Sequence, residues 1–96
     1  MRPSQSLELH RSAVRALVAR YPAANPRVFG SVARGTDTER SDIDLLVDDL
    51  PGCSHFKLGG LLMDLQDLLG CKVDLVLTDE IPERYREYIL SEAKPV

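Results

Sequence analysis

Residues 42–47 read Asp-Ile-Asp-Leu-Leu-Val, and this segment restricts the fold more than any other part of the chain. Successive side chains of a strand point to opposite faces, and here both faces carry apolar residues. Such a strand has to be covered on both sides. Amphipathic patterns at about 6–20, 54–69 and 81–92 predict helices that can provide the cover. We therefore expect an α/β fold with helices packed on a small sheet.

Shorter apolar runs predict the rest of that sheet. Residues 27–29 and 72–77 read as two further strands, which gives three strands in total. The proline-containing segment 22–26 reads as the loop before the first of them. Residues 32–34 read as one helical turn that ends at Gly35. The expected order is therefore helix, strand, short helix, strand, helix, strand, helix.

Serine and glycine positions set the expected limits of the helices. Ser4 or Ser6 is the expected N-cap of the first helix, and Gly70 is the expected end of the third. Gly59 and Gly60 lie inside the third helix, where each glycine costs about 1 kcal/mol relative to alanine. Either that helix begins at Gly60, or a neighbouring group packs closely where the side chains are missing.

Length and composition suit one small domain over residues 1–96. The net charge of −3 argues against unaided binding to phosphate backbones, so we expect no direct nucleic-acid binding. No apolar run approaches the ~18 residues of a membrane span, and the N-terminus lacks a signal-peptide pattern. We expect a cytoplasmic protein without membrane association. Cys53 and Cys71 have no metal-ligand spacing.

Three aspartates interrupt the apolar strands and need a physical reason. Asp42 and Asp44 share one face of their strand, about 6.6 Å apart at ~3.3 Å per residue. Asp74 interrupts the third strand in the same way. If the two strands are neighbours, the three carboxylates converge, at a cost that pairing or a bound cation has to offset. Such oxygen donors suit Mg²⁺, and two such ions ~3.5–4 Å apart serve in-line displacement at phosphorus.

A second element follows the first strand directly. Gly30 allows a phosphate to approach the backbone, and the Ser31 hydroxyl with nearby N–H groups can hold phosphate oxygens. Taken alone, a Gly-Ser pair is more often a plain turn. Arg34 either neutralises phosphate charge or pairs with a carboxylate of the following loop. These two readings of Arg34 stay open at this point.

Together these residues resemble the nucleotidyltransferase superfamily of DNA polymerase β. Residues 30–35 (Gly-Ser-Val-Ala-Arg-Gly), then 41–47 (Ser-Asp-Ile-Asp-Leu-Leu-Val), are similar to the family signature GSxARG…SDxDLxV. Asp74, within Val-Asp-Leu-Val, matches the third carboxylate of that family. The resemblance spans most of the chain. It is strongest to the minimal nucleotidyltransferases encoded beside HEPN-type RNase toxins, where they act as antitoxins.

The resemblance implies a mixed three-stranded sheet with packed helices and a role for each residue. Asp42 and Asp44 would hold two Mg²⁺ ions, and Asp74 would hold the ion that activates the acceptor hydroxyl and would serve as its base. Gly30 and Ser31 would bind the β- and γ-phosphates of ATP. Larger relatives carry a second, substrate-binding domain. The expectation here is that another chain, or a second copy of this one, holds the acceptor.

Three functions remain as hypotheses. The first is Mg²⁺-dependent transfer of AMP from ATP to a hydroxyl, expected to be a tyrosine, on a partner HEPN-type toxin. The second is an antitoxin that neutralises its toxin by binding alone. The third is the catalytic subunit of a two-chain transferase that acts on a small molecule. The three aspartates favour the first over the second, because occlusion does not need buried carboxylates.

Overall fold

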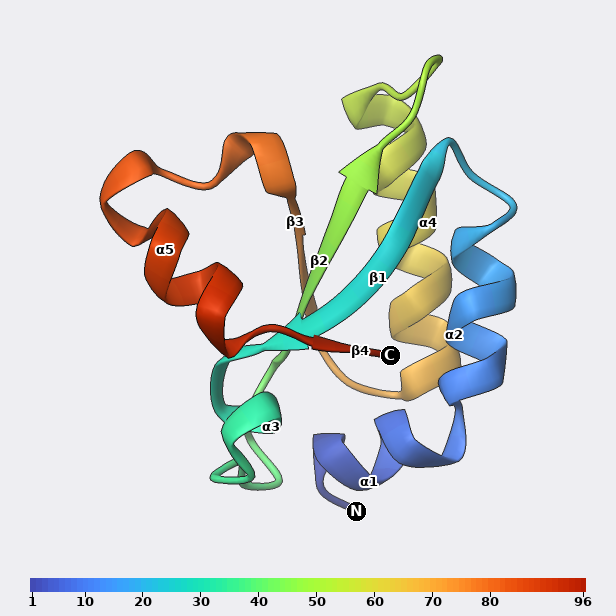
Figure 1. The fold of residues 1–96 in the computed structure, drawn as a ribbon. Coiled ribbons are helices and arrows are strands. Elements are labelled where there is room, and N and C mark those ends of the chain that lie inside the picture. Colours follow the sequence, from blue (N-terminus) through green and yellow to red (C-terminus); the bar gives the residue numbers. More distant parts are fainter.

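The computed structural model describes all residues, 1–96, and contains a mixed sheet with the order β3-β2-β1-β4. Its strands are β1 (Ala23–Phe29), β2 (Ile43–Asp49), β3 (Val73–Leu77) and β4 (Lys94–Pro95). The central strand β2 runs parallel to β3 and antiparallel to β1, and β4 is antiparallel to β1 (Figure 1). The predicted α/β fold with a mixed sheet is confirmed, but the sheet has four strands and not three.

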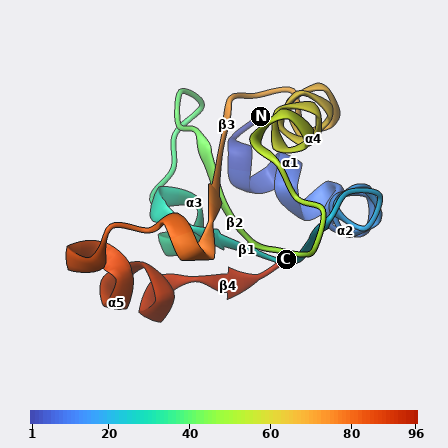
Figure 2. The same cartoon turned by 90° about the horizontal axis from the view of Figure 1, so that it is seen from above.

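Helices lie on both sides of this sheet, as the sequence predicts. Seen from above, α1 (Pro3–Leu9), α2 (Arg11–Val18) and α4 (His55–Leu69) lie on one side (Figure 2). On the other side α3 (Gly30–Arg34), which follows β1, packs against α5 (Glu83–Glu92). A 3₁₀ turn at Thr78–Glu80 joins β3 to the last helical segment. No helix is both long enough and apolar enough to cross a membrane.

The core lies between β2 and the helices α2 and α4. Alternate residues of β2 point into it and are completely buried, namely Ile43, Leu45 and Val47. Leu61 and Leu65 of α4 and Val14 of α2 meet them and are equally buried. Burial of each such side chain contributes roughly 1.5–3 kcal/mol. Leu46 points to the opposite face and is also fully buried, so β2 is covered on both sides.

The first predicted helix is two helices in the structure. The chain bends at His10, whose ring nitrogen Nδ1 lies 2.8 Å from the Ser6 carbonyl oxygen. The predicted serine N-cap is wrong, because the Ser6 hydroxyl donates to the Leu69 carbonyl at 2.6 Å instead. Ser4 donates its backbone N–H to Asp37 Oδ2 at 2.9 Å. A carboxylate 33 residues away along the chain thus caps the first turn of α1.

The first strand is longer than predicted, and the fourth was missed. β1 begins at Ala23 and continues through the segment that reads as a loop. A bulge makes this possible, because Asn25 adopts a positive φ of 57° and the register with β2 shifts there. The Pro26 carbonyl accepts a hydrogen bond from the Val96 N–H at 3.0 Å. The two-residue strand β4 is too short to show any periodicity in the sequence.

The limits of α4 agree with the prediction. The Ser54 hydroxyl accepts a hydrogen bond from the Lys57 N–H at 3.2 Å, and Gly70 ends the helix with a left-handed φ of 71°. The helix passes through both internal glycines. A Cβ at Gly60 would lie 3.4 Å from the Tyr21 ring, which is an ordinary van der Waals contact, so lack of space does not explain this glycine. Nothing lies near Gly59, and the structure gives no reason for that glycine.

Candidate active site

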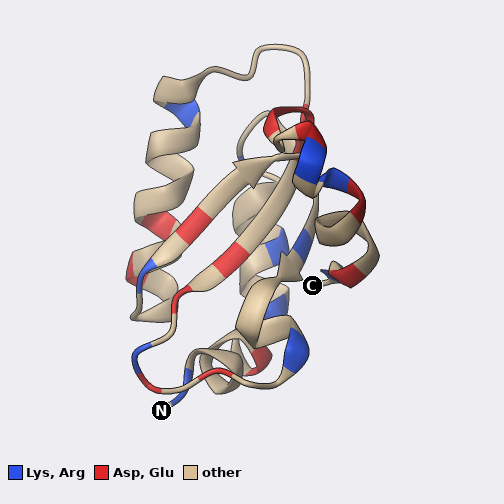
Figure 3. Ribbon diagram, turned by 90° about the vertical axis from the view of Figure 1, so that its left-hand side faces the viewer, with Lys and Arg blue, Asp and Glu red and all other residues tan.

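Asp44 and Asp74 occupy directly opposed positions on the neighbouring parallel strands β2 and β3. Figure 3 shows acidic positions side by side on two adjacent strands. Both residues lie on the face away from α4, because their sequence neighbours Ile43 and Val73 point into the core. The condition that the sequence left open, that these two strands are neighbours, is therefore met, and it brings two of the three carboxylates together.

Asp42 lies just before β2 and directs its carboxylate partly toward Lys72, whose ammonium nitrogen is 3.7 Å away. Its charge still acts on Asp44. As they stand, no three His, Cys, Asp or Glu side chains are gathered closely enough to hold one metal ion together. Asp44 and Asp74 thus form the centre of the acidic face, with Asp42 at its border and held by a lysine.

The environment of Asp44 raises the pKa of its carboxyl to about 6. Burial is the largest cause, and the negative charges of Asp74 and Asp42 act in the same direction. Arg34 lowers the pKa by a smaller amount. Ionisation of Asp44 is therefore less favourable in the protein alone than in solution. A cation placed among these carboxylates would reverse this balance, so the donor set fits a hard divalent ion such as Mg²⁺.

Asp48 lies two positions beyond Leu46 on the same face, and its environment differs from that of Asp44. It accepts hydrogen bonds from Thr78 Oγ1 and Arg27 Nη2, both at 2.5 Å, and from Asn25 Nδ2 at 3.2 Å. The Thr78 hydroxyl is the main cause that lowers the pKa of Asp48, with Asn25 and Arg27 adding to it. Asp48 therefore has a structural role. Asp44 has no such donors around it, and its side-chain hydrogen bond with Asp74 raises its pKa.

Gly30 lies against Asp44 at the junction of β1 and α3. Its φ is +74°, and a Cβ at this position would overlap Asp44 Oδ2. Both the backbone conformation and the space therefore require glycine. The following Ser31 is partly buried, and its carbonyl accepts the Thr36 N–H at 3.0 Å. The sequence places these two residues directly after the first strand, and the structure brings Gly30 against the Asp44 carboxylate.

Arg34 pairs with a residue that the sequence analysis did not single out. Its Nη1 donates to both carboxylate oxygens of Glu92, at 2.9 and 3.1 Å. The alternative that Arg34 pairs with a carboxylate of the loop 36–41 is therefore wrong. No local pattern reveals this contact, because 58 residues separate the two partners. The reading of Arg34 as a phosphate-binding residue stays a prediction.

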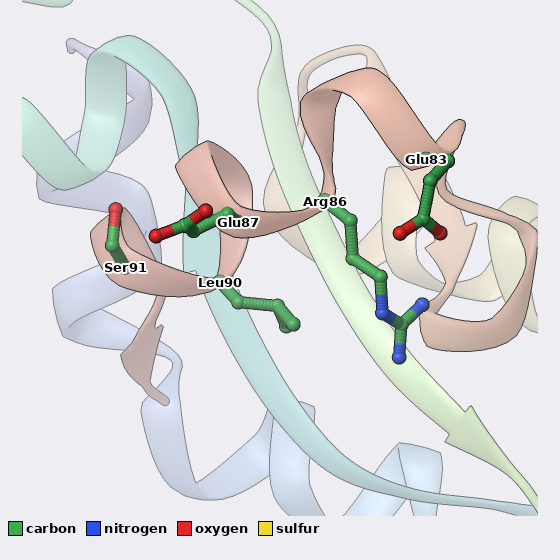
Figure 4. A pocket seen from close by; sticks show the side chains of 5 residues that line it. All are labelled: Glu83, Arg86, Glu87, Leu90 and Ser91. Atoms are coloured by element: carbon green, nitrogen blue, oxygen red, sulfur yellow. The ribbon is translucent and has the colours of Figure 1, made fainter.

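The last helix packs less closely than its pattern suggests. Ile81, just before it, is buried, but Tyr85 and Tyr88 are about half exposed. A hollow of about 570 Å³ lies along α5, lined by Glu83, Arg86, Glu87, Leu90 and Ser91 (Figure 4). None of the residues in the acidic site lines it. We therefore place the candidate active site at Asp44, Asp74 and Gly30 and not in this hollow.

Comparison with known proteins supports this assignment. Residues 10–96 match the family model of the nucleotidyltransferase domain. MJ0128 of Methanocaldococcus jannaschii, named as a candidate protein adenylyltransferase, is 38% identical over 82 residues, covering 85% of this chain and 84% of that protein. The chain therefore belongs to the nucleotidyltransferase domain family, and the predicted resemblance is confirmed.

Solved structures agree with the fold. A structure of a candidate minimal nucleotidyltransferase has 43% sequence identity and a TM-score of 0.87, covering 97% of this chain and 95% of that one. The crystal structure of a toxin-antitoxin with AMP-PNP has a TM-score of 0.76 at 22% identity. It covers 88% of this chain and 69% of its own, and at that identity it supports the fold alone.

Proposed function

We propose that this protein transfers AMP from ATP to a hydroxyl group of a partner toxin, and so acts as its antitoxin. The observation that carries the proposal is the pair Asp44 and Asp74, opposed on adjacent strands beside Gly30. Members of the family include a candidate protein adenylyltransferase, and a protein of the same fold was crystallised as a toxin-antitoxin with an ATP analogue. We place the reaction in the cytoplasm, where ATP is available.

The acidic face would hold two Mg²⁺ ions in this reaction. When bound, these ions supply charge neutralisation for the triphosphate and lower the pKa of the acceptor hydroxyl. Asp44 and Asp74 face each other, and Asp42 joins them once its side chain turns away from Lys72. The raised pKa of Asp44 supports this role, because a bound cation would offset the burial and the neighbouring negative charges that raise it.

The remaining residues would orient the nucleotide and move the proton. Gly30 lets the Asp44 carboxylate lie directly against the backbone of this turn, and its N–H, the Ser31 hydroxyl and Arg34 on the same turn would bind phosphate oxygens. The acceptor oxygen attacks the α-phosphorus, the bond to the β-phosphate oxygen breaks, and pyrophosphate leaves. Asp74, exposed at the edge strand β3, accepts the proton of the hydroxyl.

The acceptor we propose is a tyrosine of a HEPN-type RNase toxin. An added AMP would place a bulky base and a negative phosphate near an RNA-binding site, where it repels RNA by the charge rules that govern phosphorylation. Binding alone is the second candidate function. It requires one antitoxin for each toxin site, whereas a catalyst neutralises many.

Mass spectrometry of the toxin tests the proposal. The toxin encoded beside this protein is incubated with the protein, ATP and Mg²⁺ and then weighed intact. We expect additions in AMP-sized steps that disappear with Asp44→Asn. Full neutralisation by Asp44→Asn, with no mass added by the unmodified protein, would contradict the transfer and leave binding alone as the function. Asp67→Asn, which alters an exposed carboxylate of α4, is the control variant.

A further inference from the structure

One carboxylate of α5 is bound by the turn that we assign to the nucleotide phosphates. Glu92 Oε1 accepts hydrogen bonds from the Gly30 N–H at 2.5 Å and from Arg34 Nη1 at 2.9 Å. The second oxygen of Glu92 lies 3.1 Å from the same arginine nitrogen. The Glu92 side chain is only 13% exposed, although it lies in the last turn of a surface helix. Gly30 and Arg34 thus hold an anion within the protein.

The bound carboxylate is ionised. Burial opposes the charge of Glu92, but hydrogen bonds from the Gly30 N–H, the Tyr88 hydroxyl and Arg34 together lower the pKa of its carboxyl. Carboxylate and phosphate both offer anionic oxygens to N–H and guanidinium donors, and arginine binds both groups with the same geometry. The donors that hold Glu92 are therefore suited to a phosphate in its place.

The helix that carries Glu92 is attached to the rest of the protein mainly at its two ends, and β4, which pairs with β1, follows it directly. No residue of α5 is buried, and an open hollow lies along its Glu83–Ser91 side (Figure 4). Arg86 Nη1 donates to the Thr78 carbonyl at 2.7 Å near the start of the helix. Segments with few buried contacts open at a small cost in free energy. Glu92 can therefore leave the turn by a change of its own side-chain conformation, which leaves β4 and the core around β2 in place.

We propose that Glu92 occupies the place of a nucleotide phosphate, so that α5 holds the site closed until the triphosphate displaces this side chain. The proposal rests on the function proposed above, since it assigns Gly30 and Arg34 to phosphate binding. Glu92 and the triphosphate compete for the same donors. The apparent association constant for the triphosphate is then the intrinsic constant multiplied by the fraction of molecules in which Glu92 has left the turn.

The opposite role is a brace, in which Glu92 holds Gly30 and Arg34 in their active positions. The two roles predict opposite effects of Glu92→Gln. The proposed role is that of a plug, a side chain that blocks the phosphate site. If Glu92 is a plug, loss of its charge leaves the donors free and tightens triphosphate binding. A brace that loses its charge lets Arg34 move and weakens binding.

The test is calorimetric titration with inorganic tripolyphosphate in the presence of Mg²⁺, on the whole chain. We expect about tenfold tighter binding with Glu92→Gln. Glu92→Asp should also tighten binding. It keeps the charge, but its side chain is shorter by one methylene and reaches the Gly30 and Arg34 donors less well. Glu87→Gln removes the same charge from the same helix and should leave the affinity unchanged. In transfer assays, Glu92→Gln should lower KM for ATP and leave kcat unchanged.

Unchanged or weaker binding with both Glu92 variants would overturn the plug, as would equal tightening by Glu87→Gln. Failure of every variant to bind tripolyphosphate would overturn it too. The result is separate from the proposed function. If Glu92→Gln binds tripolyphosphate more tightly while no variant transfers AMP, the plug stands and the function fails. If the unmodified protein transfers AMP while both Glu92 variants bind no better, the function stands and the plug fails.

Discussion

Asp44 of β2 and Asp74 of β3 stand at the same register on adjacent parallel strands, with no cation of the protein between them. Asp42 carries the single lysine contact of this group, and Asp44 is left with a raised pKa. A protein that needed these aspartates for folding would be expected to pair them, as it pairs Asp48 with Arg27 and Thr78. The predictions below depend on this difference.

Asp44→Asn should stabilise the fold at neutral pH. The pKa of Asp44 rises from 3.8 to about 6 on folding, so its contribution to stability is present below pH 3.8 and lost as the pH rises through about 6. The variant should gain roughly 1–2 kcal/mol over the unmodified protein at pH 7, after allowance for solvent screening, and little near pH 4. Urea unfolding of both proteins at the two pH values measures this. An equal gain at both would contradict the assigned titration.

Gly30→Ala should damage the fold more than Gly35→Ala. Both glycines have a positive φ, +74° and +75°, so both substitutions carry a backbone cost of roughly 1 kcal/mol. A Cβ at Gly30 also overlaps Asp44, whereas nothing lies near Gly35. We expect a further loss of roughly 1–3 kcal/mol for Gly30→Ala. The double variant Gly30→Ala, Asp44→Ala should regain the part of the unfolding free energy that is lost to overlap with Asp44. If it does not, the clash lies elsewhere.

Ser31→Ala should weaken nucleotide binding and leave stability within about 0.5 kcal/mol of the unmodified protein. The backbone carbonyl of Ser31, and not its hydroxyl, holds Thr36 in the structure. Loss of the hydroxyl therefore removes a ligand for phosphate and no folding contact. Calorimetry with a non-hydrolysable ATP analogue measures the affinity, and an unchanged value would remove Ser31 from the site.

Gly59→Ala should stabilise the protein by about 0.5–1 kcal/mol, because alanine favours the helix and open space surrounds that position. Gly60→Ala gains the same propensity and brings its Cβ into ordinary contact with the Tyr21 ring at 3.4 Å, so its gain should be at least as large. Thermal unfolding of the two variants compares them directly. A smaller gain for Gly60→Ala would mean that the Tyr21 contact limits that position.

The parts of the fold that local patterns describe were predictable from sequence. The apolar β2, the helix between Ser54 and Gly70, and the presence of aspartates within two apolar strands follow from periodicity and capping residues, whereas the adjacency of those two strands does not. The bulge at Asn25 was not predictable, because a proline next to it reads as a loop in the absence of its partner strand. The break at His10 likewise depends on tertiary contacts, among them the bond of Ser6 to Leu69.

In the candidate site, too, some residues were predictable from local sequence patterns and others depend on tertiary contacts. Asp42, Asp44 and Asp74 stand out in sequence because charge within an apolar strand needs a reason. Glu92 does not, since glutamate near the end of a surface helix is ordinary and its partners Gly30 and Arg34 are 62 and 58 residues away. The Lys72 contact of Asp42 also depends on how the strands align. Pairings of this kind become visible only in the folded chain.

The most direct test of the central claim is to follow the label of ATP into the partner toxin. ATP labelled at the α-phosphate should transfer its label to the toxin, and ATP labelled at the γ-phosphate should not, because the γ-phosphate leaves with pyrophosphate. Asp44→Asn should lower the rate by ~100-fold or more, and Asp67→Asn should not change it. Transfer of the γ-label, or transfer by Asp44→Asn at the unmodified rate, would contradict the account.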